Sequence, residues 1–264
     1  VNDPIERHRY VISVNREADG RGGSAFVHTR LQPGDTLEAT GPRNNFALVE
    51  DASEVLLIAG GIGITPLYCM IQRLERIGQP WQLFYAARSR NKAAYLSELL
   101  ALETSNPGRV HLHFNDEHAG LPPHMAATVA TASPDAHLYC CGPAPMLAAF
   151  LKATADRPQS FVHVEYFSAA HEAATQGGYT VELARSRRSF HIPEGKTILN
   201  VLLDAGVSVD YSCEEGTCGT CETPVLEGEP DHRDSWLTPA ERASGKTMMI
   251  CCSGSRGGKL VLDL

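Results

Sequence analysis

Apolar runs that predict strands alternate with helical patterns through the middle of the chain. The run VLLIAGG (55–61) is continuously apolar, which is typical of a strand buried on both faces. Apolar side chains then recur on one face of a helix that ends at Gly78. Strands that alternate with helices predict a parallel, doubly wound α/β sheet for residues 51–167. The further elements predicted here are strands at 81–88, 110–114, 137–142 and 161–167 and helices at 93–102 and 145–153.

The first fifty residues have a different pattern, without a strong helical period. Residues 8–14 and 24–31 read as strands, and the Gly-rich stretch 18–23 between them predicts a turn. We therefore expect residues 1–50 to form part of an antiparallel β domain, which is too short to close a barrel alone.

A third pattern begins after a small, polar, Gly-rich stretch at 168–178, which predicts a linker. A hairpin is expected next, at 179–192, and a short helix at 197–206. The dipeptide Thr-Pro at 238–239 predicts another helix start, with Thr as N-cap and Pro in the first turn. A strand ends the chain, so residues 179–264 are predicted to be an α+β unit.

Composition and charge place only weak limits on function. The chain has 264 residues, of which 43% are hydrophobic and 20% charged, and a net charge of −8. A negative balance without a basic cluster argues against nucleic-acid binding. From Ser168 onward there are 14 acidic and 9 basic residues, so −5 of the −8 lies in this part. An acidic C-terminal third suits docking to a basic protein surface, and a merely solvated face explains it equally well.

The sequence pattern indicates neither a membrane-spanning helix nor a signal peptide. Residues 55–72 are uncharged, but three glycines and a proline interrupt them, so a buried strand that turns into a helix is expected. The eight cysteines gather in clusters rather than spreading evenly along the chain. This distribution favours a cytoplasmic protein with metal ligands over a secreted disulfide scaffold.

Three of the cysteines lie in YSCEEGTCGTC (211–221) with the spacing C-x4-C-x2-C. Zinc sites usually pair two short knuckles and only one is present, so the spacing favours plant-type [2Fe–2S] ligation over zinc or a disulfide. Gly216 and Gly219 permit the loop to turn its N–H groups toward a negative cluster. Cys251 is favoured as the fourth ligand, because Cys252 would face the opposite side of a strand. The predicted ligands are Cys213, Cys218, Cys221 and Cys251.

Two turns that join a strand to a helix are candidates for nucleotide binding. The first, AGGIGITP (59–66), is not G-x-G-x-x-G, but Thr65 is expected to cap the helix and Pro66 to lie in its first turn. Free N–H groups of that helix would then face a pyrophosphate. A tight turn without a ligand fits the same composition. The second turn, CCGPAPM (140–146), also ends a strand and opens a helix.

Together these motifs resemble one family. Residues 179–264 resemble a plant-type ferredoxin, and residues 1–167 resemble part of a ferredoxin-NADP-reductase-type flavoprotein. Their order resembles that of the phthalate dioxygenase reductase family. The resemblance implies a multidomain chain with a partial antiparallel flavin-binding β-barrel (1–50) and an NAD(P)-binding α/β domain with a doubly wound parallel sheet (51–167). A linker (168–178) then leads to an α+β, β-grasp ferredoxin domain.

The resemblance also assigns roles to single residues. The Cys-Gly-Pro segment borders the nicotinamide and Thr65 lies near the flavin edge, so Cys141 and Thr65 would line the hydride-transfer site. Arg88 and Arg90 lie where the second phosphate-bearing ribose is expected. They favour NADPH if they bind a 2′-phosphate, but they also suit the diphosphate, and the family favours NADH. The residues expected to contact the nucleotide are Gly60, Gly61, Gly63, Pro66, Arg88, Cys141, Gly142, Pro143 and Met146.

The resemblance implies FMN as a third cofactor. A flavin is needed because a hydride donor delivers two electrons together, whereas a [2Fe–2S] cluster accepts one. The family holds FMN with an Arg-x-Tyr-Ser motif, which would precede Val1, so a chain that began there would retain FMN weakly. Asn15 stands where relatives have lysine, and Phe167 also suits an ordinary core position. The residues expected to contact FMN are Ser13, Val14, Asn15, Arg21, Gly22, Gly23, Ser24 and Phe167.

The predicted function is that of an NADH-dependent reductase. It would act as a monomer and pass electrons through FMN and the [2Fe–2S] cluster to a terminal Rieske-type oxygenase in the breakdown of aromatic compounds. One alternative is a ferredoxin-like electron carrier whose flavoprotein part does not hold flavin, and another is a zinc-binding adaptor. Glu214 and Glu215 are candidates for the docking surface.

Overall fold

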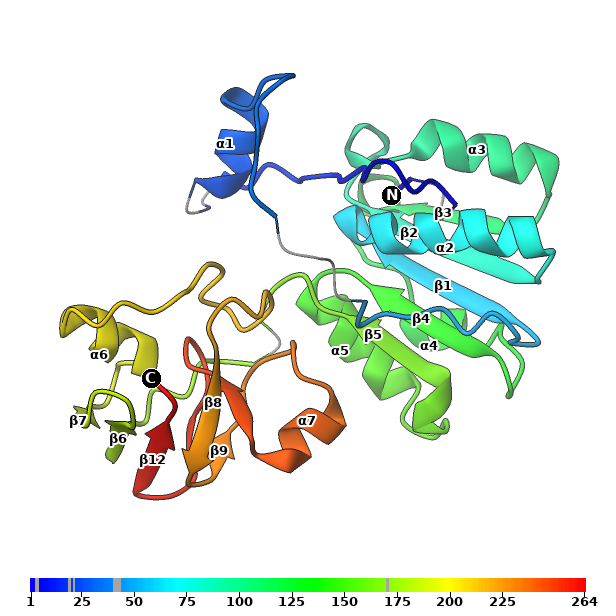
Figure 1. The fold of residues 1–264 in the computed structure, drawn as a ribbon. Helices are drawn as coiled ribbons and strands as arrows, with labels where there is room; N and C mark the ends of the chain where they lie inside the picture. The colour runs from blue at the N-terminus through cyan, green and yellow to red at the C-terminus, as the bar shows by residue number, and fades with distance from the viewer. Residues whose placement is uncertain (3–4, 19, 21, 40–43, 170) are drawn as a thin grey trace. The chain divides into compact units, whose positions relative to one another are not determined.

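The computed structural model describes residues 1–264 except 3–4, 19, 21, 40–43 and 170. The chain divides into two compact units, Val1–Glu165 and Tyr166–Leu264 (Figure 1). In the part of the chain that is described, no helix has both the length and the apolar character needed to cross a membrane.

The first unit is built on a five-stranded parallel sheet with the strand order β3-β2-β1-β4-β5. The predicted doubly wound arrangement is confirmed: α2 and α3 cover one face of the sheet, and α4 and α5 cover the other (Figure 1). Its strands are β1 (Val55–Gly60), β2 (Trp81–Ala87), β3 (Val110–Phe114), β4 (His137–Cys141) and β5 (Val162–Glu165). Its main helices are α2 (Ile64–Ile77), α3 (Leu96–Ser105), α4 (Met125–Val129) and α5 (Ala144–Ala153). Its 3-10 turns are η1 (Gly61–Gly63), η2 (Arg90–Lys92), η3 (Asn115–His118) and η4 (Gln159–Phe161).

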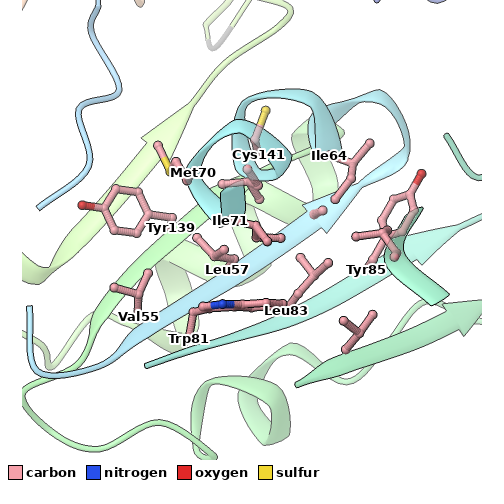
Figure 2. Close-up of a cluster of buried hydrophobic side chains, with 14 of the residues drawn as sticks. Val55, Leu57, Ile64, Met70, Ile71, Trp81, Leu83, Tyr85, Tyr139 and Cys141 are labelled. Atoms are coloured by element: carbon pink, nitrogen blue, oxygen red, sulfur yellow. The ribbon is translucent and has the colours of Figure 1, made fainter. Parts of the chain in front are cut away.

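The main core of this unit lies between the sheet and α2. Every residue of β1 is buried, as its continuous apolar run predicts. Val55 and Leu57 of β1 pack with Ile71 of α2 and with Trp81 and Leu83 of β2 (Figure 2). Each fully buried side chain of this size contributes about 1.5–3 kcal/mol to folding. This packing holds α2 firmly on the sheet and therefore fixes the turn that connects it to β1.

The strands predicted at 8–14 and 24–31 are wrong. Among the described residues of the first fifty, the single element is helix α1 (Gly23–Thr29), and residues 8–14 have no regular secondary structure. Gly22 has a left-handed conformation (φ 103°) and its carbonyl accepts a 2.8 Å hydrogen bond from the Phe26 N–H, which starts a helix. A strand also needs a neighbour for its hydrogen bonds, and the described part of this segment supplies none.

The second unit is an α+β domain, as predicted. Its five-stranded sheet has the order β10-β8-β12-β6-β7, in which only the β12–β6 pair is parallel, and β11 and β9 form a separate pair. The predicted cap at Thr238 is confirmed: its hydroxyl accepts from the Glu241 N–H, and Pro239 begins the helix. The strands are β6 (Tyr179–Leu183), β7 (Arg188–Ile192), β8 (Glu222–Glu227), β9 (Pro230–Asp231), β10 (Thr247–Met249), β11 (Gly254–Ser255) and β12 (Lys259–Leu262). The helices are α6 (Ile198–Asp204) and α7 (Pro239–Ser244).

Candidate functional site

The two predicted nucleotide turns lie side by side at one edge of the parallel sheet. β1 and β4 are hydrogen-bonded neighbours, with Ala59 opposite Cys141 near their carboxyl ends. The chain runs from β1 outward to β2 and β3, then returns to the other side of β1 for β4 and β5. The order therefore reverses between β1 and β4, and open α/β sheets bind ligands in the crevice at such a point.

Glycines allow the two turns to touch through their backbones. A Cβ atom added to Gly60 would lie 2.6 Å from Pro143 Cδ. A Cβ atom added to Gly63 would lie 2.2 Å from the carbonyl oxygen of Cys141, which is a backbone contact that cannot move aside easily. The residues predicted for nucleotide binding in these turns are thus brought together. Their roles toward the nucleotide remain predictions.

The remaining glycines of the two turns differ in what surrounds them. A Cβ atom on Gly142 would lie 2.7 Å from the sulfur of Met146, so this glycine serves close packing. Gly61 has a left-handed conformation (φ 53°) and open space around its missing side chain. The backbone at Gly61 is thus open to an approaching ligand, whereas a side chain at Gly142 would displace the Met146 side chain and crowd the Gly60 backbone, 3.1 Å away.

Thr65 does not cap α2, which corrects the expectation from sequence. α2 begins at Ile64 and its N-cap is Gly63, because the 3-10 turn η1 leads directly into the helix. The Thr65 hydroxyl donates instead to the carbonyl of Ile62 (3.0 Å), and the side chain is buried. Pro66 lies within the first turn of the helix, where its missing N–H costs nothing.

Cys141 is fully buried, on the face of the sheet toward α2. Burial, and then the nearby Glu165 carboxylate, raises the pKa of the Cys141 thiol to about 12. Burial likewise raises the pKa of Cys140, which alternates to the other face. Both thiols are therefore protonated at neutral pH. Cys141 has no means to act as a nucleophile there, so any part in hydride transfer is steric.

Arg88 and Arg90 lie at the carboxyl end of β2, next to β1. Arg88 is exposed. The Arg90 guanidinium is held by the Glu117 carboxylate of η3, with Nε 2.6 Å from Oε1 and Nη2 3.2 Å from Oε2. It also lies over the Phe114 ring, 4.6 Å from the centroid. The sequence did not indicate Glu117, because β2 and η3 are separated along the chain and nothing in their composition links them.

The residues predicted to contact FMN are only partly brought together. Val14 accepts a hydrogen bond from the His28 ring (2.8 Å), and the Ser24 hydroxyl accepts from the Glu17 N–H (3.1 Å), so both sequence stretches meet around α1. The Ser13 hydroxyl, however, bonds to Tyr95, and the Asn15 amide donates to Glu17. These two side chains would have to exchange partners to bind FMN.

Two further flavin predictions stand apart from this group. Arg21 lies outside the described residues. Phe167 belongs to the second unit, and 47% of its surface is exposed. An exposed aromatic side chain does not fit the alternative of an ordinary core position. Its role toward FMN remains a prediction.

The four predicted ligands of the cluster lie in two segments of the second unit. Cys213, Cys218 and Cys221 belong to the loop between α6 and β8, and Cys251 lies in the turn that follows β10. The Cys213 N–H donates to the Cys218 sulfur (3.5 Å), and the Cys221 thiol donates to the sulfur of Cys251. Cys213 thus lies beside Cys218, and Cys221 lies beside Cys251, whose thiol also contacts Cys252. In the described part of the chain, no three His, Cys, Asp or Glu side chains form a preassembled metal site.

The loop directs backbone N–H groups at its first sulfur. The N–H groups of Glu215 and Thr217 donate to Cys213 Sγ at 3.3 and 3.4 Å. Burial opposes ionisation of this thiol, but hydrogen bonds from the Thr217 side chain and from these N–H groups outweigh it and lower the Cys213 pKa to about 7. A thiolate is the form that binds iron, so the loop is already suited to ligation.

Two glycines of the loop are required by its shape. Gly216 (φ 69°) and Gly219 (φ 76°) both have left-handed conformations. A Cβ atom on Gly216 would lie 2.5 Å from Cys252 Sγ, and one on Gly219 would lie 2.2 Å from the Trp236 ring. The predicted function of these glycines, to let the chain turn tightly, therefore agrees with their surroundings.

The donor set fits a [2Fe–2S] cluster. Such a cluster has two irons and takes four thiolates, two for each iron, which agrees with two pairs of thiols and with N–H donors around them. Cys251, rather than Cys252, contacts Cys221, which favours Cys251 as the fourth ligand. The two residues lie in a turn and not in a strand, so the reason first given for this choice is wrong although the choice itself is supported.

A buried carboxylate, Asp234, joins the two ligand-bearing segments. It is completely buried, and its Cα would lie 2.9 Å from a Cβ atom on Gly216 of the loop. Its carboxylate accepts from the Leu237 N–H (2.8 Å) and, at 3.5 Å, from the hydroxyl of Ser253, two residues after Cys251. No sequence pattern indicated this role, because Asp234 lies among other charged residues without a periodic pattern.

Replacing Asp234 by Ala is expected to lower the free energy of unfolding of the second unit by about 1–3 kcal/mol, because the Leu237 N–H would lose its partner. Asp234→Asn should cost less, since an amide oxygen still accepts that bond. Denaturant unfolding followed by circular dichroism would measure both. An Ala variant as stable as the unaltered chain would contradict the role given to Asp234.

Both units of the chain match known protein families. Residues 57–152 match the family model of the oxidoreductase NAD-binding domain, and residues 181–254 match the model of the 2Fe-2S iron-sulfur cluster binding domain. The phenoxybenzoate dioxygenase subunit beta of Ectopseudomonas oleovorans is 54% identical over 265 residues, and the match covers 100% of this chain and 81% of that protein.

Two solved structures extend the likeness to the fold. An intact type IV self-sufficient cytochrome P450 monooxygenase is 39% identical with a TM-score of 0.83, over 100% of this chain and 34% of the other. Phthalate dioxygenase reductase, described as a modular structure for electron transfer from pyridine nucleotides to [2Fe–2S], is 39% identical with a TM-score of 0.69, over 100% of this chain and 81% of the other. The chain is therefore an NADH-dependent oxidoreductase and belongs to the phthalate dioxygenase reductase family, whose members use FMN and a [2Fe–2S] cluster to supply electrons to oxygenases.

Proposed function

We propose that this chain is a monomeric reductase that supplies a Rieske-type terminal oxygenase acting on an aromatic compound. The observation that supports this most directly is the arrangement of four cysteines as two thiol pairs in the second unit, with N–H donors around Cys213. Such a site carries electrons one at a time. It needs a source of electrons, which the nucleotide site on the same chain would provide.

NADH would bind across the reversal point between β1 and β4. The first N–H groups of α2 face the carboxyl end of β1 and suit a pyrophosphate. The backbone of Gly61 has open space beside it for a ligand. The turn formed by Cys141, Gly142 and Pro143 would border the nicotinamide. The buried Thr65 and Cys141 side chains would exclude water beneath the ring. Hydride transfer requires no general acid or base, so these residues act by position.

Bound FMN would convert a two-electron hydride into two single electrons. The stretch that contains Ser13, Val14 and Asn15 and the stretch that contains Gly22, Gly23 and Ser24 would hold it, once Ser13 and Asn15 release their present partners. Arg21 and Phe167 complete this proposed set. The four cysteines would hold the cluster, with Gly216 and Gly219 allowing the loop its shape.

The surface beside the cluster loop is the proposed docking face for the oxygenase. Glu214 and Glu215 are exposed and follow Cys213 directly. Tyr211, two residues before Cys213, is 45% exposed. An electron must leave close to the cluster, so a partner with a basic patch would be guided here by opposite charge.

The cofactor content of the purified chain tests this proposal. Material prepared without air is expected to contain two irons and two acid-labile sulfides for each chain, to be red-brown, and to reduce cytochrome c with NADH when FMN is added. A red-brown protein that never binds flavin would support the ferredoxin-like carrier instead. A colourless protein with zinc would support the adaptor, and the proposal would fail.

A further inference from the structure

The end of β2 has a feature that the proposed nucleotide site does not explain. In doubly wound nucleotide domains, an acidic residue near this position binds the ribose 2′-hydroxyl of NAD, whereas an arginine accommodates the 2′-phosphate of NADP. Here β2 is followed directly by Arg88, Ser89 and Arg90, and the two arginines by themselves favour NADPH. Yet the family uses NADH. Something else at this site must oppose the two arginines.

Glu117 is placed to do so. It lies in η3, after the neighbouring strand β3. Its two carboxylate oxygens accept hydrogen bonds from Nε and Nη2 of Arg90, at 2.6 and 3.2 Å. The turn is fixed beside β2, because the Asp116 N–H donates to the carbonyl of Arg88 (3.1 Å). The Arg90 guanidinium also lies over the Phe114 ring, 4.6 Å from its centroid. Arg90 is thereby held on the β3 side by three contacts.

Much of the local positive charge is offset as a result. Arg88, Arg90 and Lys92 carry three positive charges, and Asp116 and Glu117 carry two negative charges. The hydrogen bond with Arg90 lowers the pKa of Glu117, so Glu117 is ionised at neutral pH. A 2′-phosphate brings close to two further negative charges. Besides the exposed Arg88 and Lys92, it would meet a guanidinium already held by Glu117 and the repulsion of two carboxylates. A 2′-hydroxyl is neutral and would meet no such repulsion.

We propose that Glu117 sets the preference of this site for NADH over NADPH, by occupying Arg90 and cancelling its charge. The inference rests on the proposed nucleotide site and adds a residue that determines its specificity. Both side chains are about half exposed, so their ion pair contributes little to stability, and replacing Glu117 should leave the fold intact.

The test compares three variants of the full chain. Glu117→Gln keeps the size of the side chain but releases Arg90 and adds one positive charge. Asp116→Asn makes the same change of charge one residue away without releasing Arg90, and serves as the matched control. The double variant with Glu117→Gln and Arg90→Gln removes the guanidinium as well. Titration calorimetry with adenosine 2′,5′-bisphosphate and with adenosine 5′-monophosphate measures the 2′-phosphate directly, without flavin or iron.

Glu117→Gln is expected to bind adenosine 2′,5′-bisphosphate about tenfold more tightly, the scale of one new charge-assisted hydrogen bond, with little change for the monophosphate. The double variant should lose that gain, and the ratio of kcat/KM for NADPH over NADH should follow the same order. An equal gain in Asp116→Asn, or none in Glu117→Gln, would overturn the role of Glu117. Failure of the unaltered chain to bind the monophosphate would instead overturn the nucleotide site itself, and this inference with it.

Discussion

Cys218→Ser is expected to stop NADH-dependent reduction of cytochrome c while leaving reduction of added FMN by NADH unchanged. The serine oxygen is a poor replacement for a soft thiolate, so one iron would lose a ligand and the cluster would be lost or disabled. The nucleotide site belongs to the other unit and contains none of the cluster ligands, so hydride transfer should continue. Stopped-flow absorbance at flavin wavelengths and a cytochrome c assay separate the two steps.

Cys69→Ser is the matched control for this variant. Cys69 is also a partly buried cysteine outside any disulfide, but it lies on α2 of the first unit, where its thiol donates to the Asn2 carbonyl (3.7 Å), and it is not part of any proposed site. It should retain both activities. Cytochrome c reduction that persists in Cys218→Ser would show that electrons reach the acceptor without the cluster, and the proposed route would be wrong.

Gly63→Ala is expected to lower kcat/KM for NADH on the order of 100-fold, because displacement of a binding turn by about 1 Å costs that much. The added methyl group would lie 2.2 Å from the Cys141 carbonyl oxygen, so β1–α2 and β4–α5 must move apart. Overpacking of this kind also lowers the free energy of unfolding by about 1–3 kcal/mol. Steady-state kinetics and denaturant unfolding measure the two effects.

Gly257→Ala gives a suitable comparison, since Gly257 has open space around it and no left-handed conformation. It should change neither kcat/KM for NADH nor the free energy of unfolding. If Gly63→Ala kept the affinity for NADH of the unaltered chain, the two turns would not be the place where the nucleotide binds. Loss of stability without loss of affinity would point to the same conclusion.

The sequence was sufficient where a local pattern decides the structure. The continuous apolar run at 55–60 gave β1, and the stop at Gly78 gave the end of α2, where glycine has a left-handed conformation. The Thr-Pro start at 238–239 gave α7 with its cap. The spacing of the cysteines indicated the iron–sulfur chemistry, which the family match bears out. In each case the signal lies within about fifteen residues.

The sequence was insufficient where distant segments decide the structure. The stretch 24–31 has strand-like residues, but no strand lies beside it among the described residues of the first fifty, and it forms helix α1 after Gly22. Thr65 was expected to cap α2 because its residue type suits a cap, yet the N-cap is Gly63, two residues earlier, where the turn η1 leads into the helix. The contacts of Asp234 and Glu117 depend on the packing of separate loops. The hydrophobic pattern of the sequence does not predict such contacts.

The spacing of the cysteines along the chain has a consequence for how the second unit matures. Cys221 and Cys251 are thirty residues apart, and Asp234 lies between them. A cluster bound to both would act as a cross-link that closes this loop, and a covalent link over such a length restricts the unfolded chain by on the order of 3–4 kcal/mol. Iron insertion and folding would then reinforce each other, so newly made chains that lack iron should be the ones most readily degraded by proteases.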